Sequence, residues 1–126
     1  MNKFHLSIFT ALMLSVAIGT PAWADTYKWG AIAVDTEKAE KAPAWGVGGG
    51  DTEKDASDAA VNLCKEEGGA VCKAAVTYEQ CGALAVDGKG AAGWGKSPTK
   101  GGAEKQAIDG CGADSCSVVT SDCNNE

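Results

Sequence analysis

The sequence contains no arginine, and the only histidine among its 126 residues, His5, stands close to the N-terminus. Beyond that point the chain has no imidazole, the side chain that most often transfers protons or binds metals near neutral pH. It also has no guanidinium group, whose planar fork recognises phosphates and carboxylates. We therefore do not expect a histidine-dependent enzyme.

Basic surfaces and cofactor motifs are missing as well. The formal net charge is −6, so the chain offers no basic surface for nucleic acid. The glycine run at 46–51 lacks the endings and spacings of nucleotide-binding loops, and no C-x-x-C pair suggests a zinc site. We expect no cofactor, no metal and no nucleic-acid partner.

Residues 1–24 have the features of a cleaved secretory signal peptide. A short positive start precedes an apolar run, and Ala22, Trp23 and Ala24 form an A-x-A cleavage site. The run is too short for a membrane span, which argues against an uncleaved anchor. We predict that 25–126 is a single exported domain without a transmembrane segment, located in the periplasm or outside the cell.

The predicted exported part repeats itself. The segment GAIAVD at 30–35 recurs as GALAVD at 82–87, and the matched features that follow stay in the same order. These matched pairs are Trp45 and Trp94, Thr52 and Thr99, Cys64 and Cys111, and Cys72 and Cys116. Copy one spans about 27–80 and copy two about 81–123.

Each copy has the pattern of a β-β-α-β unit. Two short strands precede a helix that begins after a capping threonine, Thr52 or Thr99, and a third strand follows. The buried face of the first helix is mostly alanine, with Leu63 as its one large anchor. We predict an α+β fold in which both copies share one mainly antiparallel sheet, and in which 72–87 forms one long or bent strand.

All six cysteines lie in the predicted exported part, which is typical of a disulfide framework. Six cysteines allow many pairings, but the repeat favours a symmetric one. In each copy one cysteine ends the helix and the next begins a strand. This predicts the pairs Cys64–Cys72 and Cys111–Cys116, and leaves Cys81–Cys123.

Three tryptophans followed by glycine, Trp29, Trp45 and Trp94, are candidate partner-binding residues, because an exposed indole offers a platform for sugar or peptide. Phenylalanine is absent after residue 9, so large side chains are scarce. Volume therefore favours Trp45 and Trp94 as core residues. Trp29 has no counterpart in copy two, and we expect it to be the exposed one.

Carboxylates provide the remaining candidate chemistry. Asp35 and Asp87 stand at matched strand ends. A paired-acid hydrolase needs two such groups close together in a cleft. An aspartate at the end of a strand more often forms a turn, and we favour that interpretation.

Taken together, these residues make the chain resemble the small exported bacterial proteins of the domain of unknown function 4189 family. The resemblance covers nearly all of 27–123. It implies export, a disulfide-bonded α+β fold and no settled activity, and it transfers no catalytic residue. The positions that carry it are Gly30–Ala33, Trp45, Gly46, Cys64, Cys72, Cys81–Ala85, Trp94, Gly95, Cys111, Cys116 and Cys123.

We predict a non-enzymatic binding or interaction protein of the bacterial envelope, with an unidentified protein or glycan partner. One version is an inhibitor or immunity-type protein whose acidic surface meets a basic target such as a lysozyme-like wall hydrolase. The alternatives are a carboxylate-dependent glycan hydrolase and a cell-envelope or virulence accessory protein.

Overall fold

The computed structural model describes residues 27–37 and 43–124. In this part of the chain the β-β-α-β unit occurs twice, which confirms the predicted α+β class and the tandem repeat. The predicted signal peptide, 1–24, lies outside the described residues. The elements are β1 (Trp29–Val34), β2 (Trp45–Gly50), α1 (Glu53–Glu66), β3 (Lys73–Tyr78), β4 (Cys81–Val86), β5 (Ala92–Ser97), α2 (Lys100–Cys111) and β6 (Ser117–Cys123).

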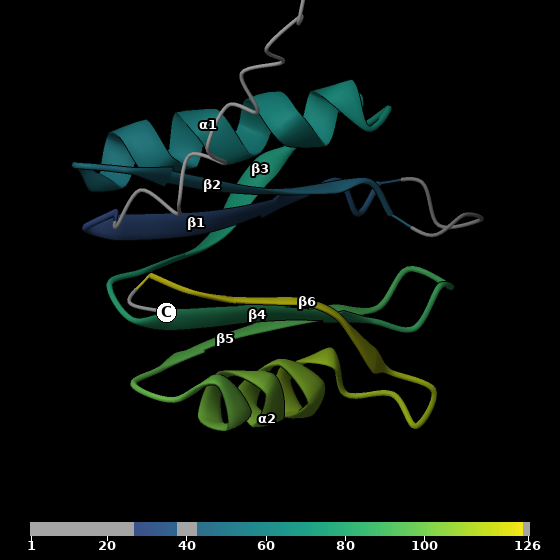
Figure 1. The fold of residues 1–126 in the computed structure, drawn as a ribbon. Helices are drawn as coiled ribbons and strands as arrows, with labels where there is room; N and C mark the ends of the chain where they lie inside the picture. The colour runs from purple at the N-terminus through teal and green to yellow at the C-terminus, as the bar shows by residue number, and fades with distance from the viewer. Residues whose placement is uncertain (1–26, 38–42, 125–126) are drawn as a thin grey trace, which may run out of the picture.

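The two copies do not share one sheet, and this part of the prediction is wrong. Each copy forms its own three-stranded antiparallel sheet, in the order β2-β1-β3 and β5-β4-β6. The sheets stack face to face, and each carries its helix on the outer face (Figure 1). Both faces of the central strands β1 and β4 are apolar and buried. A helix covers only one of these faces, so the other face of each sheet is buried against its neighbour.

The larger side chains lie between the two sheets. They come from both copies and form one buried layer. The two outer layers, between each sheet and its helix, consist mainly of alanine and cysteine. The inner layer consists of Ile32, Val34, Val76, Tyr78, Leu84 and Val86.

Glycines on the edge strands allow each helix to approach its sheet closely. A Cβ added at Gly48 would lie 2.3 Å from the backbone N of Ala60 on α1. The closest stripe of α1 is therefore Ala56, Ala60 and Cys64, one residue every helical turn. Leu63 lies beside this stripe and is 42% exposed, so the prediction that it anchors the helix is wrong.

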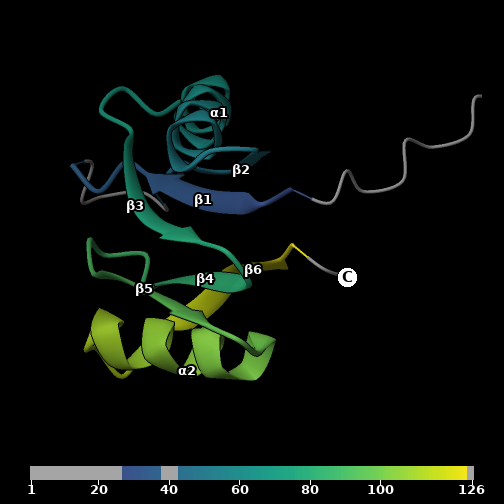
Figure 2. The ribbon, with the colours of Figure 1, turned by 90° about the vertical axis from the view of Figure 1, so that its left-hand side faces the viewer.

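The chain passes from one sheet to the other through a short link. We predicted one continuous strand over 72–87, but β3 ends at Tyr78 and β4 begins at Cys81 (Figure 2). Asn124 holds the link in place, because its side-chain amide donates to Tyr78 O at 3.2 Å and to Glu79 O at 3.0 Å. The backbone N of Asn124 also donates to Gln80 O at 2.8 Å.

Tyr78 joins the two copies. Its ring lies against Gly30 of β1 and Gly82 of β4, where an added Cβ would come within 2.3 and 2.2 Å of ring carbons. Its hydroxyl donates to Asp122 Oδ2 on β6 at 2.7 Å. Burial, followed by this hydrogen bond, raises the pKa of Tyr78 above its ordinary value.

Replacing Tyr78 by phenylalanine should lower the free energy of unfolding by about 1–2 kcal/mol, because it removes a hydrogen bond to a carboxylate. The native protein should also lose stability as the pH rises above about 10, the ordinary pKa of tyrosine. The raised pKa means that the folded state holds this proton more firmly than the unfolded state, so the contribution is complete below that pH. Urea unfolding of both proteins at neutral and alkaline pH measures the difference, and an equal alkaline loss in both would contradict it.

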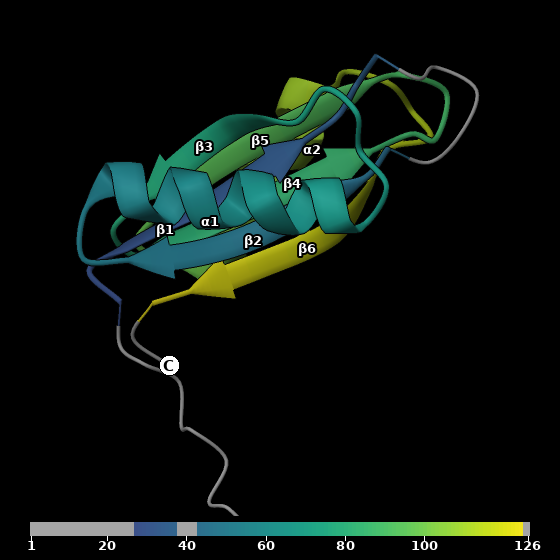
Figure 3. The ribbon, with the colours of Figure 1, turned by 90° about the horizontal axis from the view of Figure 1, so that it is seen from above.

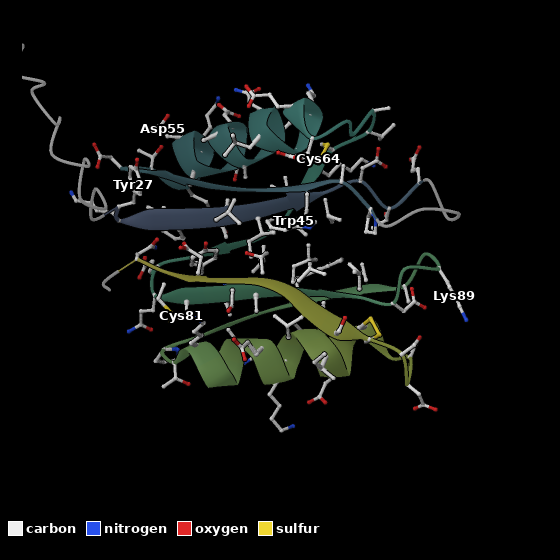
Figure 4. All side chains as sticks on the ribbon, turned by 45° about the vertical axis from the view of Figure 1, so that its right-hand side comes forward. Tyr27, Trp45, Asp55, Cys64, Cys81 and Lys89 are labelled. Atoms are coloured by element: carbon white, nitrogen blue, oxygen red, sulfur yellow. A yellow bond between two sulfur atoms is a disulfide. The ribbon has the colours of Figure 1, made fainter. Side chains whose placement is uncertain are left out.

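Three disulfides join the six cysteines, and they are the same pairs that the repeat predicts. Two bridges each tie the end of a helix to the strand that follows it. The third joins Cys81 and Cys123, which lie directly opposite each other on β4 and β6. Figure 4 shows Cys64 near the end of α1 and Cys81 at the start of β4.

Candidate functional site

The three tryptophans occupy different environments. Trp45, on β2, is partly buried and packs against the inner layer, as predicted (Figure 4). Trp94, on β5, is 45% exposed, so the prediction that it fills the core is wrong. Trp29 is partly buried against the outer layer under α1, so it is not the exposed tryptophan that we predicted. Tyr78 and aliphatic residues fill the space between the sheets instead.

The exposure of Trp94 follows from its place at the edge of the sandwich. Strand β5 pairs only with β4, and β3 pairs only with β1, within the residues that the structure describes. Strands β3 and β5 lie along one side of the sandwich, and β2 and β6 along the other (Figure 3). Trp94 therefore stands at the open seam between β3 and β5.

Three adjoining hollows follow this seam, with volumes of about 410, 370 and 360 Å³. The first and second share Ala75 and Trp94, and the second and third share Thr77 and Lys96. We call this continuous depression the β3–β5 furrow. Its walls include Val71, Lys73, Ala75, Thr77, Trp94 and Lys96.

Apolar surface is distributed along the whole furrow. Val71, which is 38% exposed, lies at one end, Trp94 in the middle and Trp29 at the other end. Val71 was not among the candidate binding residues predicted from the sequence, because it follows a glycine turn and belongs to no recognisable motif. The furrow thus brings together two of the three candidate tryptophans, while Trp45 lies outside it.

Polar side chains accompany the tryptophans. Lys73 and Lys96 line the furrow, and Thr77 lies between them along the seam. The Thr77 hydroxyl donates to Glu53 Oε1 at 2.7 Å. Gln106, from α2, accepts at Oε1 a hydrogen bond from the backbone N of Lys96 at 3.2 Å, which holds its amide at the furrow wall.

A buried carboxylate fixes one end of the furrow. Asp35 is 3% exposed, and its Oδ2 accepts from the backbone N of Ala70 at 2.8 Å and of Val71 at 3.0 Å. Its Oδ1 accepts from the backbone N of Glu37 at 3.0 Å. Asp35 therefore ties the segment that carries Val71 to the end of β1.

Asp87 has the matching position in copy two. Its Oδ1 accepts from the backbone N of Lys89 at 2.8 Å and of Ala91 at 2.9 Å. These hydrogen bonds, that from Lys89 first, hold the pKa of Asp87 below its ordinary value. Asp87 thus stabilises its own loop, which fits the turn interpretation, whereas Asp35 holds its own loop and also the distant segment that carries Val71.

Replacing Asp35 by asparagine should lower the free energy of unfolding by about 2 kcal/mol, because a charged acceptor of several backbone N–H groups is lost. Both oxygens of Asp35 accept, and an amide has only one oxygen. Asp87→Asn is the matched control, since one oxygen makes both of its bonds. Urea unfolding should show a much smaller loss for the control, and equal losses would contradict this account.

A larger hollow of about 720 Å³ lies on the other side of copy one, beside the end of α1. Trp45 and the exposed Leu63 contribute apolar surface to it, and Glu67 contributes a charge. Asp35 also borders it, but its oxygens accept the backbone bonds described above. The charged side chains that line this hollow, Asp35 and Glu67, are both acidic.

The described residues do not support a metal site, a membrane-spanning helix or a phosphate-binding loop. No group of three or more histidine, cysteine or acidic side chains within 27–37 and 43–124 could hold a metal ion. No helix in this part of the chain is long and apolar enough to cross a membrane. The glycine run at 46–51 lies mostly within β2 and packs under α1, and does not form a phosphate-binding loop.

Comparison with known proteins gives one match. A family model described as a domain of unknown function, DUF4189, matches residues 29–123, which include both copies. No curated protein and no solved structure matches the chain.

Proposed function

The chain belongs to the DUF4189 family, and we propose that it acts as an exported, non-enzymatic binding protein of the bacterial envelope. The β3–β5 furrow is the binding site in this proposal. The exposure of Trp94 is the observation that carries it. An indole that is 45% exposed, in a chain with few large side chains, offers contact area that the fold itself leaves unused.

The disulfides support the exported location. Three bridges use all six cysteines, and such frameworks persist in oxidising compartments. Reducing conditions in the cytosol would work against them. The signal-peptide pattern at 1–24 points the same way.

An inhibitor or immunity-type role is a narrower form of the proposal. The outer side of α1 exposes Asp55, Asp58 and Glu66, of which Asp58 pairs with Lys54, and Figure 4 shows Asp55 on that helix. Such a surface would attract a basic wall hydrolase. Titration of a cationic wall hydrolase with the oxidised protein tests this role, and an unchanged rate with no complex on gel filtration would remove it.

The alternative of a carboxylate-dependent glycan hydrolase has less support. Asp35 and Asp87 were its candidate residues, and the carboxylates of both accept hydrogen bonds from backbone N–H groups. No observation favours a second pair. We therefore propose binding without catalysis.

Sedimentation with isolated cell envelopes tests the binding function. The oxidised protein, beginning at residue 25, should bind them, and Trp94→Ala should weaken binding about tenfold, as expected for loss of a central aromatic contact. Leu63→Ala is the matched control, because Leu63 is similarly exposed but lies outside the furrow. Equal binding by all three proteins would contradict the furrow as the site.

A further inference from the structure

We infer that the ligand of the β3–β5 furrow is an uncharged linear polysaccharide, held along its length rather than by an end. This inference rests on the proposed binding function and specifies its partner. Four properties of the furrow lead to it: its shape, its side-chain chemistry, its charge and the form of its two strands.

The shape of the furrow fits an extended chain. The hollows are arranged in a line because successive ones share residues, first Ala75 and Trp94 and then Thr77 and Lys96. They follow two strands of six residues each, which span about 20 Å. A compact small molecule would use a single enclosed pocket. A shallow line of hollows suits the internal part of a polymer.

The side chains have the mixed character that sugars require. A sugar ring has an apolar face, which stacks on an indole, and hydroxyls around its rim, which need hydrogen-bonding partners. Trp94 and Trp29 provide apolar surface at two separate points of the furrow. Lys96 and the fixed amide of Gln106 provide polar groups beside Trp94.

The charge of the furrow fits a neutral ligand. The chain as a whole has a net charge of −6. The furrow is lined by two lysines, Lys73 and Lys96, and by two glutamates, Glu37 and Glu79. This balance favours neither a cationic nor a polyanionic partner, whereas electrostatic complementarity would require an excess of one sign.

The form of the two strands argues against a peptide. An extended peptide would bind by adding a strand to the edge of β3 or β5. Strand β3 has an irregular register, since Val76 pairs with Ile32 and Ala74 with Ala33, which leaves Ala75 as a bulge. Bulges and lysines on edge strands oppose such pairing. Lys73 stands at the start of β3 and Lys96 on β5.

The repeat supplies a variant for the test. The register of β6 shifts at the same place as that of β3, so Val119 is the counterpart of Ala75. The smaller Ala75 lines two hollows together with Trp94. Ala75→Val should therefore narrow the furrow while Trp94 stays in place.

Titration with two uncharged tetrasaccharides tests the inference, using β-1,4-linked N-acetylglucosamine and β-1,4-linked glucose. At least one should change the tryptophan fluorescence of the oxidised protein in a saturable way. Trp94→Ala and Ala75→Val should each weaken binding about tenfold or more, as expected when a central contact is lost. Leu63→Ala should bind like the native protein. Amide chemical shifts of the native protein should change along β3 and β5, which locates the site even if a variant fails to fold.

The outcomes separate this inference from the proposed function. If neither tetrasaccharide binds while envelopes still bind through Trp94, the ligand is not a glycan of this kind and the binding function stands. Competition by an extended peptide for that envelope binding would then identify strand addition instead. Binding of a tetrasaccharide with shift changes away from β3 and β5 would overturn the furrow as its site. If neither envelopes nor sugars bind, both proposals fail.

Discussion

Reduction of the three disulfides should unfold this protein at room temperature. The bridges span 8, 42 and 5 residues of sequence. Loop closure assigns them about 2.5, 4 and 2 kcal/mol of stabilisation. A domain of this size has a total stability of about 5–15 kcal/mol. Because much of the core is alanine, with small buried areas, we expect the oxidised protein to lie in the lower part of this range, so that loss of the bridges removes most or all of its stability.

Circular dichroism during heating, with and without a strong reductant, measures this effect. The oxidised protein should show a cooperative transition, and the reduced protein should show little native signal from the start. Replacing Cys81 and Cys123 together should cost more than replacing Cys64 and Cys72 together, because the former pair closes the longer loop. A Tm that reductant leaves unchanged would contradict the prediction.

Replacing Gly93 by alanine should destabilise the protein by about 3 kcal/mol, near the upper end of overpacking effects. A Cβ at this position would lie 2.0 Å from Cys111 N and 2.2 Å from Ala107 O, both backbone atoms of α2. No side-chain rotation relieves such contacts. The helix would have to move away from β5, and the packing of Ala103 and Ala107 would be lost.

Gly101→Ala is the matched control for Gly93→Ala. Gly101 lies in α2, has no positive φ and has open space around its Cα. Alanine there should stabilise the protein by up to about 0.5 kcal/mol, since glycine loses more backbone freedom than alanine when a helix forms and Gly101 lies in the first turn. Urea unfolding of the two variants measures opposite shifts. A loss of equal size in both would indicate that the close contact at Gly93 is not the cause.

Much of the fold could be predicted from the repeat. Matching the two copies gave the order of the elements and the three disulfide pairs. The capping threonines were also recognisable, and in the structure the hydroxyls of Thr52 and Thr99 accept from the backbone N of Asp55 and Gly102, at 3.1 Å in both cases. These features depend on local sequence, and the same local pattern occurs in both copies.

The arrangement of the two sheets could not be predicted in the same way. The sequences of β1 and β4 contain no polar residue, so both faces of each strand are apolar. They do not show which element covers each face. The sequence does contain an indication that Tyr78 lies between the sheets. Gly30 and Gly82 occupy matched positions, and two such glycines provide the space for one large ring between the sheets.

The furrow was hidden for a related reason. The sequence matched Trp45 with Trp94, so volume arguments assigned them the same role. The strand registers show that this match is wrong by two residues, because Trp94 pairs with Leu84 as Val47 pairs with Ile32. Trp94 therefore takes the place that the smaller Val47 has in copy one, at the edge of the sandwich. The W-G dipeptides, which recur in both copies, concealed this difference in register.

The stacking of the two sheets has a consequence for the origin of the chain. One β-β-α-β unit alone would expose the inner face that carries Ile32, Val34, Val76 and Tyr78. Such a unit would need a second unit opposite it, and an ancestor with one copy would have been a homodimer. The present chain is then a fused dimer whose halves became free to diverge. Cys81, which stands where copy one has Trp29, and Trp94, which stands where copy one has Val47, would be products of that divergence.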